Sequence, residues 1–409
     1  FNVPYGQFLE LYLFGQKHGF AELCRELTKG LKPLVLEPEE RLKDLARLAV
    51  KLSLQDVFND HRGSEVFTVL GKSDKGREWM KKFDEFKYPY FLAPESQGLY
   101  IDEKPWIDDP VTLFENIRNF IDKLDKGESI ERDVEGLLRE RDEMTEKCRQ
   151  MIKTDEDRKE FDKLLGETRK VAHFSEDHNF FIEFWAYGLV RKKVVELGEW
   201  LCRHKIINEP EDIYFFVRYE LDEVIFDVCQ AWGVGIPVKD IYWKKKVAKR
   251  KMMWEKLCEY TPPTLLGVFP EGEFSDPSTV MLWGITKERL EEWERAEEEE
   301  SDVVNGVAAS AGVTEGPAVV ILRFSESYKV KNGDILVTFS TAPAWGPVVV
   351  RSKGVVLDSG GNMCHAAIIA REEGIPAVSG TLSATRRIKT GDIIRVDGDK
   401  GIVTILKRA

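Results

Sequence analysis

The sequence of 409 residues predicts a mostly α-helical domain over residues 1–300, followed by a small α/β domain, rich in β-strands, over residues 301–409. Three observations lead to this prediction. The chain is longer than one ordinary domain. Apolar residues recur at helical spacing through the first part, whereas short Val and Ile runs separated by glycines fill the last part. The acidic run Glu297–Glu300, followed by Ser301 and Asp302, lies between these two sequence patterns and marks the domain boundary that we expect.

The composition is that of a folded protein that does not coat polyanions. Hydrophobic residues make up 43% and charged residues 32%, so a packed core is expected. Lys and Arg total 60 against 72 Asp and Glu, a net charge of −12, which argues against nucleic-acid or anionic membrane partners. No apolar run reaches the roughly 20 residues of a membrane span. Even the segment around Phe180–Val190 is interrupted by Glu183.

The cysteines and the N-terminus point to a cytoplasmic protein. The six cysteines form no CxxC pair, which favours reduced thiols over a disulfide scaffold or a zinc site. No signal-peptide pattern is present. The chain starts at Phe1, so we expect it to be a trimmed or processed piece of a longer polypeptide.

Helical periodicity runs through the first 260 residues. The stripe Phe8, Leu11, Tyr12 and Phe14 predicts the first helix. Gly63–Lys104 is rich in Gly, Pro and aromatic residues and is predicted to form loops. Short strands and turns are predicted over 264–286, after the break at Pro262 and Pro263. The other predicted helices lie around Leu42–Leu52, Ile130–Leu165, Phe180–Cys202, Asp222–Trp232, Lys244–Tyr260 and Lys287–Glu300.

The last part alternates short apolar runs with turns. One helix, about Cys364–Glu373, interrupts the strands and is closed by Gly374 as a C-terminal cap. The predicted strands are Ala318–Leu322, Asp334–Thr338, Val348–Val350, Gly354–Leu357, Ile393–Val396 and Ile402–Leu406.

The segment Gly354–Val378 reads as strand, glycine turn, helix, turn and strand. Gly360 and Gly361 allow the backbone to turn sharply and to approach a ligand. His365 falls in the first helical turn, where backbone N–H groups and the helix dipole favour an anion. A neutral imidazole is also a nucleophile toward phosphorus. His365 is therefore a candidate phosphoryl carrier; the alternative is a histidine that only caps or packs.

Residues Asn305–Leu406 resemble the phosphohistidine swivelling domain of the PEP-utilising enzymes, which include PEP synthase, pyruvate phosphate dikinase, rifampicin phosphotransferase and phenylphosphate synthase. The resemblance implies that His365 is phosphorylated and that Gly360, Gly361 and Cys364 bind the phosphoryl group. The family usually carries Thr-Ser or a similar pair before this histidine. Here Met363-Cys364 stands instead, so a hydroxyl is replaced by a weak thiol donor.

The helical part resembles the substrate domain of rifampicin phosphotransferase-like proteins more faintly. The segments that carry this resemblance are Asp60–Glu65, Pro105–Pro110, Glu176–Arg191, Pro210–Phe216 and Pro262–Gly267. It implies an acceptor-binding domain that meets the swivelling domain across a flexible connection near Glu297–Asn305.

The parts that are missing distinguish the members of the family. We find no glycine-rich phosphate loop of an ATP-grasp domain, and no PEP/pyruvate barrel follows the histidine domain. The pattern is most similar to the phenylphosphate synthase subunit that carries the phosphohistidine. This implies a dikinase-like phosphotransferase of phenol degradation, with ATP and Mg²⁺ or Mn²⁺ bound by an ATP-grasp partner chain and phenol as acceptor. The alternatives are a rifampicin-type antibiotic phosphotransferase lacking its ATP domain, and a non-catalytic phosphocarrier or regulatory module.

His61, Arg62 and Glu65 are the first candidates for the acceptor site. His61 is predicted to act as the base that helps the phenol lose its proton, and Arg62 to clamp phosphate oxygens. The alternative is a salt-bridge cluster on a loop.

Further candidates lie on later helices. His178 is predicted to hydrogen-bond the phenol, and Phe181 and Trp185 to line an apolar pocket; the alternatives are a core histidine and plain core aromatics. Arg250, in a basic helical segment, is predicted to dock the phosphorylated domain or the partner, unless that face is only solvated. Arg371, behind His365, is a lesser candidate to pair with a Glu or the phosphate.

Overall fold

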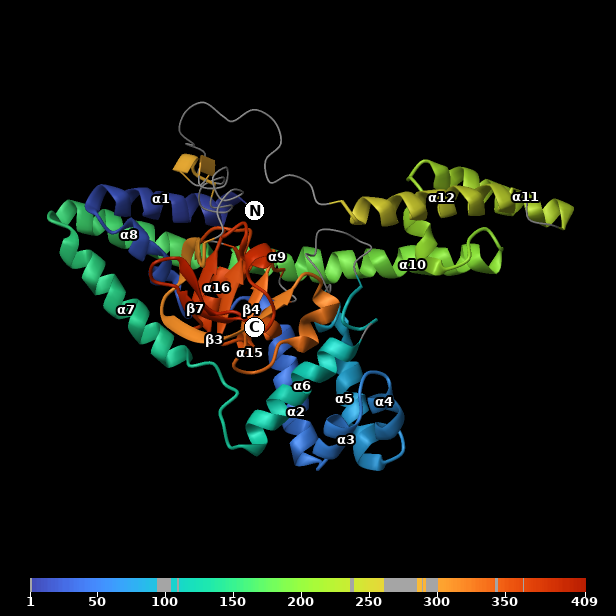
Figure 1. Cartoon of the computed structure of the whole chain (residues 1–409), viewed down its shortest axis with the longest axis horizontal. Helices are drawn as coiled ribbons and strands as arrows, with labels where there is room; N and C mark the ends of the chain where they lie inside the picture. Colours follow the sequence, from blue (N-terminus) through green and yellow to red (C-terminus); the bar gives the residue numbers. More distant parts are fainter. Residues whose placement is uncertain are drawn as a thin grey trace. The chain divides into compact units, whose positions relative to one another are not determined.

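The computed structural model describes residues 2–93, 104–108, 110–235, 239–260, 285–288, 290–291, 301–342, 345–362 and 364–409. The chain divides into two compact units (Figure 1). The first comprises Phe1–Leu99, Lys104–Trp185 and Pro270–Ala409, and the second comprises Tyr100–Glu103 and Ala186–Phe269. We describe each unit by itself. In the described residues, no helix is long and apolar enough to cross a membrane.

The predicted N-terminal stripe is buried in the first helical layer of the first unit. Phe8, Leu11 and Phe14 lie in one cluster with Phe161 and Cys24. Two of the helices begin at side-chain caps, since the carboxylate of Asp133 and the hydroxyl of Thr154 accept N–H groups of the following turn. The layer consists of α1 (Asn2–His18), the 3₁₀ helix η1 (Ala21–Thr28), α7 (Val134–Met151) and α8 (Asp155–Val171).

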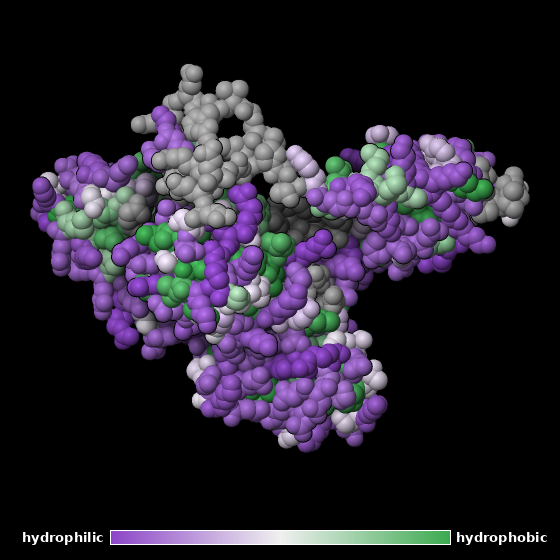
Figure 2. Space-filling view, viewed as in Figure 1, coloured by the Kyte–Doolittle hydropathy of each residue, from purple (hydrophilic) through white to green (hydrophobic). Residues whose placement is uncertain are grey.

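A second helical layer of the same unit corrects the expectation of loops over Gly63–Lys104. Most of that stretch is helical, and in α5 (Asp74–Tyr90) the residues Trp79, Phe83 and Phe86 follow at three- and four-residue spacing and are buried. The hydrophilic residues face outward, as the lower part of Figure 2 shows over α3–α5. Residues 94–103 lie outside the described residues. The layer contains η2 (Leu34–Leu36), α2 (Glu37–Lys51), α3 (Gln55–Asp60), α4 (Glu65–Leu70), α5 (Asp74–Tyr90) and α6 (Pro110–Asp125).

The helix predicted over Phe180–Cys202 starts as a π-helix. α9 (Phe174–Asn179) continues into the π-helical turn η3 (Phe180–Ala186), and the regular helix α10 (Tyr187–Arg203) begins in the second unit. A π-turn widens the helical repeat, so a strict 3.6-residue assignment of faces fails there.

The second unit is a small helical body. Besides α10, it contains η4 (Pro210–Phe215), α11 (Glu220–Val234) and α12 (Asp240–Cys258), which confirms the helices predicted around 222–232 and 244–260. Trp243 is fully buried and donates from Nε1 to Asp227 Oδ2 at 2.7 Å. The strands predicted over 264–286 lie outside the described residues, apart from 285–286. The same holds for most of the helix predicted over Lys287–Glu300.

The C-terminal part of the first unit is built on one eight-stranded sheet in the order β1-β8-β7-β3-β4-β5-β6-β2. β3, β4, β5 and β6 are parallel, while the pairs at both ends are antiparallel. The strands are β1 (Val303–Asn305), β2 (Val307–Ser310), β3 (Val313–Ile321), β4 (Ile335–Thr338), β5 (Gly354–Leu357), β6 (Ala377–Ser379), β7 (Ile393–Asp397) and β8 (Ile402–Lys407).

Alternate residues of the central strands enter two cores. Leu336 and Val355 point into one cluster, and Val337 and Val356 into the other. This alternation follows from the two-residue repeat of a strand. Both faces are therefore covered, as parallel strands require.

Short helices complete this part. They are η5 (Phe324–Lys329), α15 (Gly346–Arg351), α16 (His365–Glu372) and α17 (Ala384–Arg387). The strand predicted at Val348–Val350 is wrong, because the run belongs to α15. A short run that is buried all round does not distinguish a strand from a helix. Gly374, with a φ of +66°, follows α16 as the sequence predicts.

Candidate functional site

A tight glycine turn leads from β5 to His365. Gly360 has a φ of +109°, and a Cβ at this position would lie 2.8 Å from Cys364 Cβ. The backbone N–H of Cys364 donates to Gly361 O at 3.1 Å and closes the turn. Only glycine combines this φ with so close an approach. The turn is therefore shaped by its own residues, as the sequence predicts.

His365 is the first residue of α16 and is half-buried. Cys364 occupies the N-cap position, and its side chain does not cap the helix. The first-turn N–H groups and the positive end of the helix dipole therefore lie next to the imidazole, an arrangement that stabilises an anion there. The geometry suits a histidine that carries a phosphoryl group. Met363 lies outside the described residues.

A buried carboxylate, which the sequence analysis missed, lies between β5 and the glycine turn. Asp358 is 2% exposed; it accepts hydrogen bonds from Thr381 Oγ1 at 2.9 Å and Thr385 N at 3.2 Å, and also from Thr385 Oγ1. Burial raises the pKa of Asp358, and the threonine donors act against that rise. The sequence signal was available, since Asp358 is the first residue after a buried strand and precedes the glycine pair.

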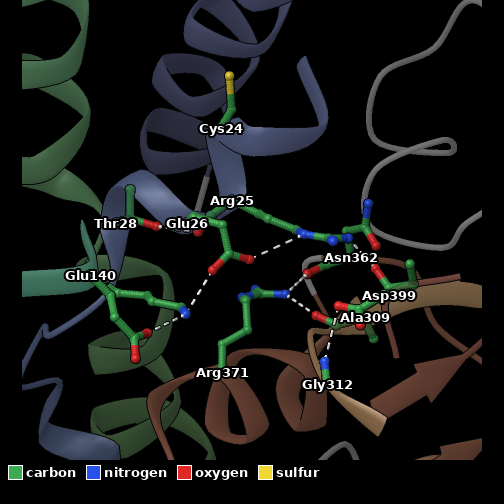
Figure 3. A network of polar contacts seen from close by, with 12 residues as sticks. Cys24, Arg25, Glu26, Thr28, Glu140, Ala309, Gly312, Asn362, Arg371 and Asp399 are labelled. Carbon is green, nitrogen blue, oxygen red and sulfur yellow. Dashed lines mark hydrogen bonds and ion pairs between the residues drawn. The ribbon is translucent and has the colours of Figure 1, made fainter. Parts of the chain in front are cut away.

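Arg371 supports the same turn from the side. It is 6% exposed, and its Nη1 donates to Asn362 O at 2.8 Å and to Ala309 O at 2.7 Å (Figure 3). The segment before His365 is thereby tied to β2. The sequence analysis expected Arg371 to pair with a Glu or the phosphate, whereas the described bonds go to backbone carbonyls.

The helix η1 meets this region with a set of charges (Figure 3). Arg25 donates to Ala308 O on β2, and its Nε lies 3.3 Å from Glu26 Oε1. Lys29 Nζ lies 2.7 Å from Glu26 Oε2 and 3.0 Å from Glu140 Oε2. Burial would raise the pKa of Glu26, but the positive charges around it, first Lys29 and then Arg371, hold it below its ordinary value.

His61, Arg62 and Glu65 gather at the turn between α3 and α4. His61 Nδ1 lies 4.0 Å from Glu65 Oε2, and Arg62 Nε lies 3.4 Å from Glu115 Oε1. The Arg62 and Glu65 side chains are largely exposed. Arg118 donates to His61 O at 3.0 Å and fixes the backbone of the turn. These contacts favour the salt-bridge alternative, and the acceptor role of the three residues stays a prediction.

His178 lies on a separate helix, α9, with Nδ1 3.3 Å from Phe174 O. Phe181 and Trp185 stack with ring centroids 6.3 Å apart and are 46% and 39% exposed. They therefore lie on the surface rather than within the core of the first unit. Their role in binding an acceptor also stays a prediction.

Arg250 is held within the second unit. Its Nη1 and Nη2 lie 2.5 and 2.9 Å from the two carboxylate oxygens of Glu220, and Nη1 also donates to Phe215 O at 2.7 Å. The hydrogen bonds from Arg250 are the main reason that the pKa of Glu220 falls to about 2. This pairing favours a structural role, and the docking role is still a prediction.

Two cavities stand out among the described residues. One of about 360 Å³ lies in the second unit between the end of α10 and α11. The other, of about 350 Å³, lies in the first unit and is lined mostly by charged residues of α2, of the segments before η2 and α7, and by Glu373. Among the described side chains, no group of three or more His, Cys, Asp or Glu residues is arranged to hold a metal ion.

Comparison with known families matches two parts of the chain. Residues 330–401 match the mobile domain of PEP-utilising enzymes, and residues 9–176 match the fourth domain of rifampicin phosphotransferase. The glycine turn and His365 lie within the first match.

Curated relatives match longer stretches. An uncharacterized phosphotransferase, YvkC, of Bacillus subtilis is 28% identical over 358 residues, 87% of this chain and 40% of the relative. A rifampicin phosphotransferase of Bacillus cereus is 31% identical over 356 residues, 86% of this chain and 37% of the relative. A probable phosphoenolpyruvate synthase of Pyrococcus abyssi is 48% identical over 220 residues, 51% of this chain and 26% of the relative. The chain thus spans 40% or less of the length of these relatives.

Proposed function

We propose that this chain is a phosphotransferase of the PEP-utilising type, in which His365 receives a phosphoryl group and passes it to an acceptor, because residues 330–401 match the mobile domain of those enzymes. The observation that carries the proposal is the position of His365. It opens α16 directly after the Gly360–Gly361 turn, inside the segment that matches the mobile domain.

In the first half-reaction, a ring nitrogen of neutral His365 attacks a phosphorus atom of ATP. The N–P bond forms while a P–O bond to the nucleotide breaks. Attack on the γ phosphorus releases ADP; attack on the β phosphorus releases AMP, and water then removes the terminal phosphate from the pyrophosphorylated histidine. Such a transfer depends on in-line approach and on neutralisation of charge more than on covalent assistance. The start of α16 supplies backbone N–H groups next to the imidazole, which stabilise the phosphoryl oxygens.

In the second half-reaction, an oxygen of the acceptor attacks the phosphorus of phosphohistidine. The O–P bond forms, the N–P bond breaks, and the acceptor proton goes to a base, which returns His365 to its neutral form. His61 stays our candidate for this base, with Arg62 close by on the same turn.

We expect ATP to be bound by an ATP-grasp partner chain, with Mg²⁺ or Mn²⁺ arriving together with the nucleotide.

The acceptor is the open part of the proposal. Relatives named rifampicin phosphotransferase match most of this chain, which supports a hydroxyl of a rifampicin-type antibiotic. Phenol is the acceptor expected from the sequence. The 48% identity to a probable phosphoenolpyruvate synthase adds pyruvate as a third acceptor to be tested.

The experiment supplies ATP labelled at the β or γ phosphate, Mg²⁺ and a separate ATP-grasp subunit, and measures acid-labile label on this chain. The same measurement is made on His365→Ala. The labelled chain is then chased with phenol, rifampicin or pyruvate, and the product is identified.

Label that is lost in His365→Ala and discharged to one acceptor supports the phosphotransferase and names its substrate. Label on His365 that none of the three acceptors discharges favours the phosphocarrier or regulatory module. If the wild-type chain takes no label beside a competent donor, the phosphohistidine proposal is refuted.

A further inference from the structure

Arg371 is a buried cation that the proposed transfer does not use as a phosphate ligand. It lies on α16 with His365, and one of its nitrogens bonds both Asn362 O, on the turn before His365, and Ala309 O, on β2. A buried guanidinium stays charged, and it is retained only where it satisfies specific acceptors. The two carbonyls that accept its bonds are 53 residues apart in the sequence. Arg371 therefore holds the turn before His365 against β2, which the residues of the turn alone do not do.

The helix η1 approaches the same place from the helical part of the first unit (Figure 3). Arg25 donates to Ala308 O, next to the carbonyl that Arg371 binds. Glu26 is 8% exposed, and among the negative charges its carboxylate has the largest effect on the pKa of Arg371. Burial lowers the pKa of Arg371, and the charge of Glu26 opposes that effect.

The neighbouring residue of α16 meets the end of η1 as well. The backbone N–H of Gly30 donates to both oxygens of Glu372, at 3.2 and 3.0 Å, and Arg132 Nη2 lies 3.3 Å from Glu372. Glu372 is 6% exposed. The segment that begins at Arg25 thus bonds Glu372 of α16 through Gly30 and bonds β2 through Arg25, next to the carbonyl that Arg371 holds.

We propose that Arg371 is a positioning residue for His365, and that η1, through Arg25 and Glu26, is the surface on which the mobile domain docks to set that position. The inference rests on the proposed function, since it assigns the residues that prepare His365 for transfer. When the mobile domain leaves η1, Arg371 loses the charge of Glu26, and the turn before His365 loses a support. Docking and the geometry of His365 are therefore coupled.

The first test observes His365 directly and needs no phosphoryl chemistry. The whole chain is labelled with ¹³C at the histidine ring, the His365 signal is assigned with His365→Gln, and its pH titration is followed by NMR. We compare Arg371→Met, which leaves both carbonyls without their donor, with Arg371→Lys, which restores a charged donor. Glu26→Gln removes the charge on the side of η1.

Two matched controls separate positioning from a general loss of charge. Arg395→Met removes an arginine from β7 that is 49% exposed. Glu140→Gln removes the exposed carboxylate that shares Lys29 with Glu26. We expect Arg371→Met and Glu26→Gln to shift the His365 titration beyond both controls, and Arg371→Lys to restore part of the wild-type midpoint.

The second test measures transfer with the donor subunit and with whichever of the three acceptors discharges the label in the experiment above. A displacement of about 1 Å at a reacting group lowers the rate on the order of 100-fold, so Arg371→Met should lower kcat by about 10–100-fold. KM for the acceptor should stay unchanged, because the described contacts of Arg371 lie within the mobile domain and near η1.

Each outcome decides the inference. If Arg371→Met folds and its His365 signal titrates as it does in Arg395→Met, the positioning role of Arg371 is wrong. If Glu26→Gln behaves as Glu140→Gln, the docking role of η1 is wrong; this variant also decides when Arg371→Met does not fold. If the wild-type chain accepts no phosphoryl group, the proposed function fails, while the NMR titration still decides the positioning role.

Discussion

Replacing Gly360 by alanine should test whether the shape of the turn before His365 determines how fast this histidine is phosphorylated. The backbone there has a φ of +109°, and the new Cβ would lie 2.8 Å from Cys364 Cβ and 3.0 Å from its Sγ. A strained backbone conformation of this kind costs on the order of 1–3 kcal/mol. Since Cys364 is the N-cap of α16, relief of the contact must move the residue directly before His365.

Two measurements follow from this geometry. The free energy of unfolding in urea should fall by about 1–3 kcal/mol. The rate at which His365 takes up label from ATP should fall by about 10–100-fold, because the imidazole is displaced from its line of attack.

Gly374→Ala is the matched control at the other end of α16. Its φ is +66°, but no atom lies within 4 Å of the added Cβ. It should therefore lose about 1–2 kcal/mol of stability from the left-handed conformation alone and keep the labelling rate. If both variants label equally fast, the argument that the turn positions His365 is refuted.

Two further predictions concern the half-buried carboxylate of Glu373 and the buried carboxylate of Asp358. Burial first, then the charge of Glu39, raises the pKa of Glu373 to about 7. The folded state therefore holds a proton that the unfolded state releases above about pH 4.5, so stability should fall between about pH 4.5 and 7, on the order of 1–3 kcal/mol. The free energy of unfolding, measured with urea, should be lower at pH 7.5 than at pH 5 in the wild type and in the control Glu131→Gln, which changes an exposed residue. Glu373→Gln should lose this difference. The same difference in Glu373→Gln would contradict the assignment to Glu373. Asp358→Asn points an amide N–H₂ at hydroxyl and N–H donors and should cost about 1–3 kcal/mol in urea unfolding. Asp334→Asn, on an exposed turn, should lower the free energy of unfolding clearly less. Equal losses in the two variants would show that the bonds of Asp358 to the threonines add no more stability than those of an exposed turn.

The sequence predicted the features that depend on near neighbours. The glycine turn, the start of α16 close to His365 and the cap at Gly374 follow from residues within a few positions of one another. The buried stripe of Phe8, Leu11 and Phe14 follows from helical spacing in the same way.

Two stretches differ from the prediction. Gly and Pro favour loops over Gly63–Lys104, but Trp79, Phe83 and Phe86 form a buried face at helical spacing and belong to α5. The apolar run Val348–Val350 favours a strand, but it is buried on all sides, carries no periodicity and belongs to α15.

The sequence by itself determined that this chain has a histidine at the start of a helix after a glycine turn, and the chemistry of those residues indicated phosphoryl transfer. Only the tertiary structure decided which residues far apart in sequence surround the turn before this histidine. Asp358 bonds Thr381 and Thr385, which follow β6, and Arg371 bonds Ala309 on β2. Such partners are chosen by the packing of strands and helices far apart in sequence, and no local pattern of residues encodes that choice.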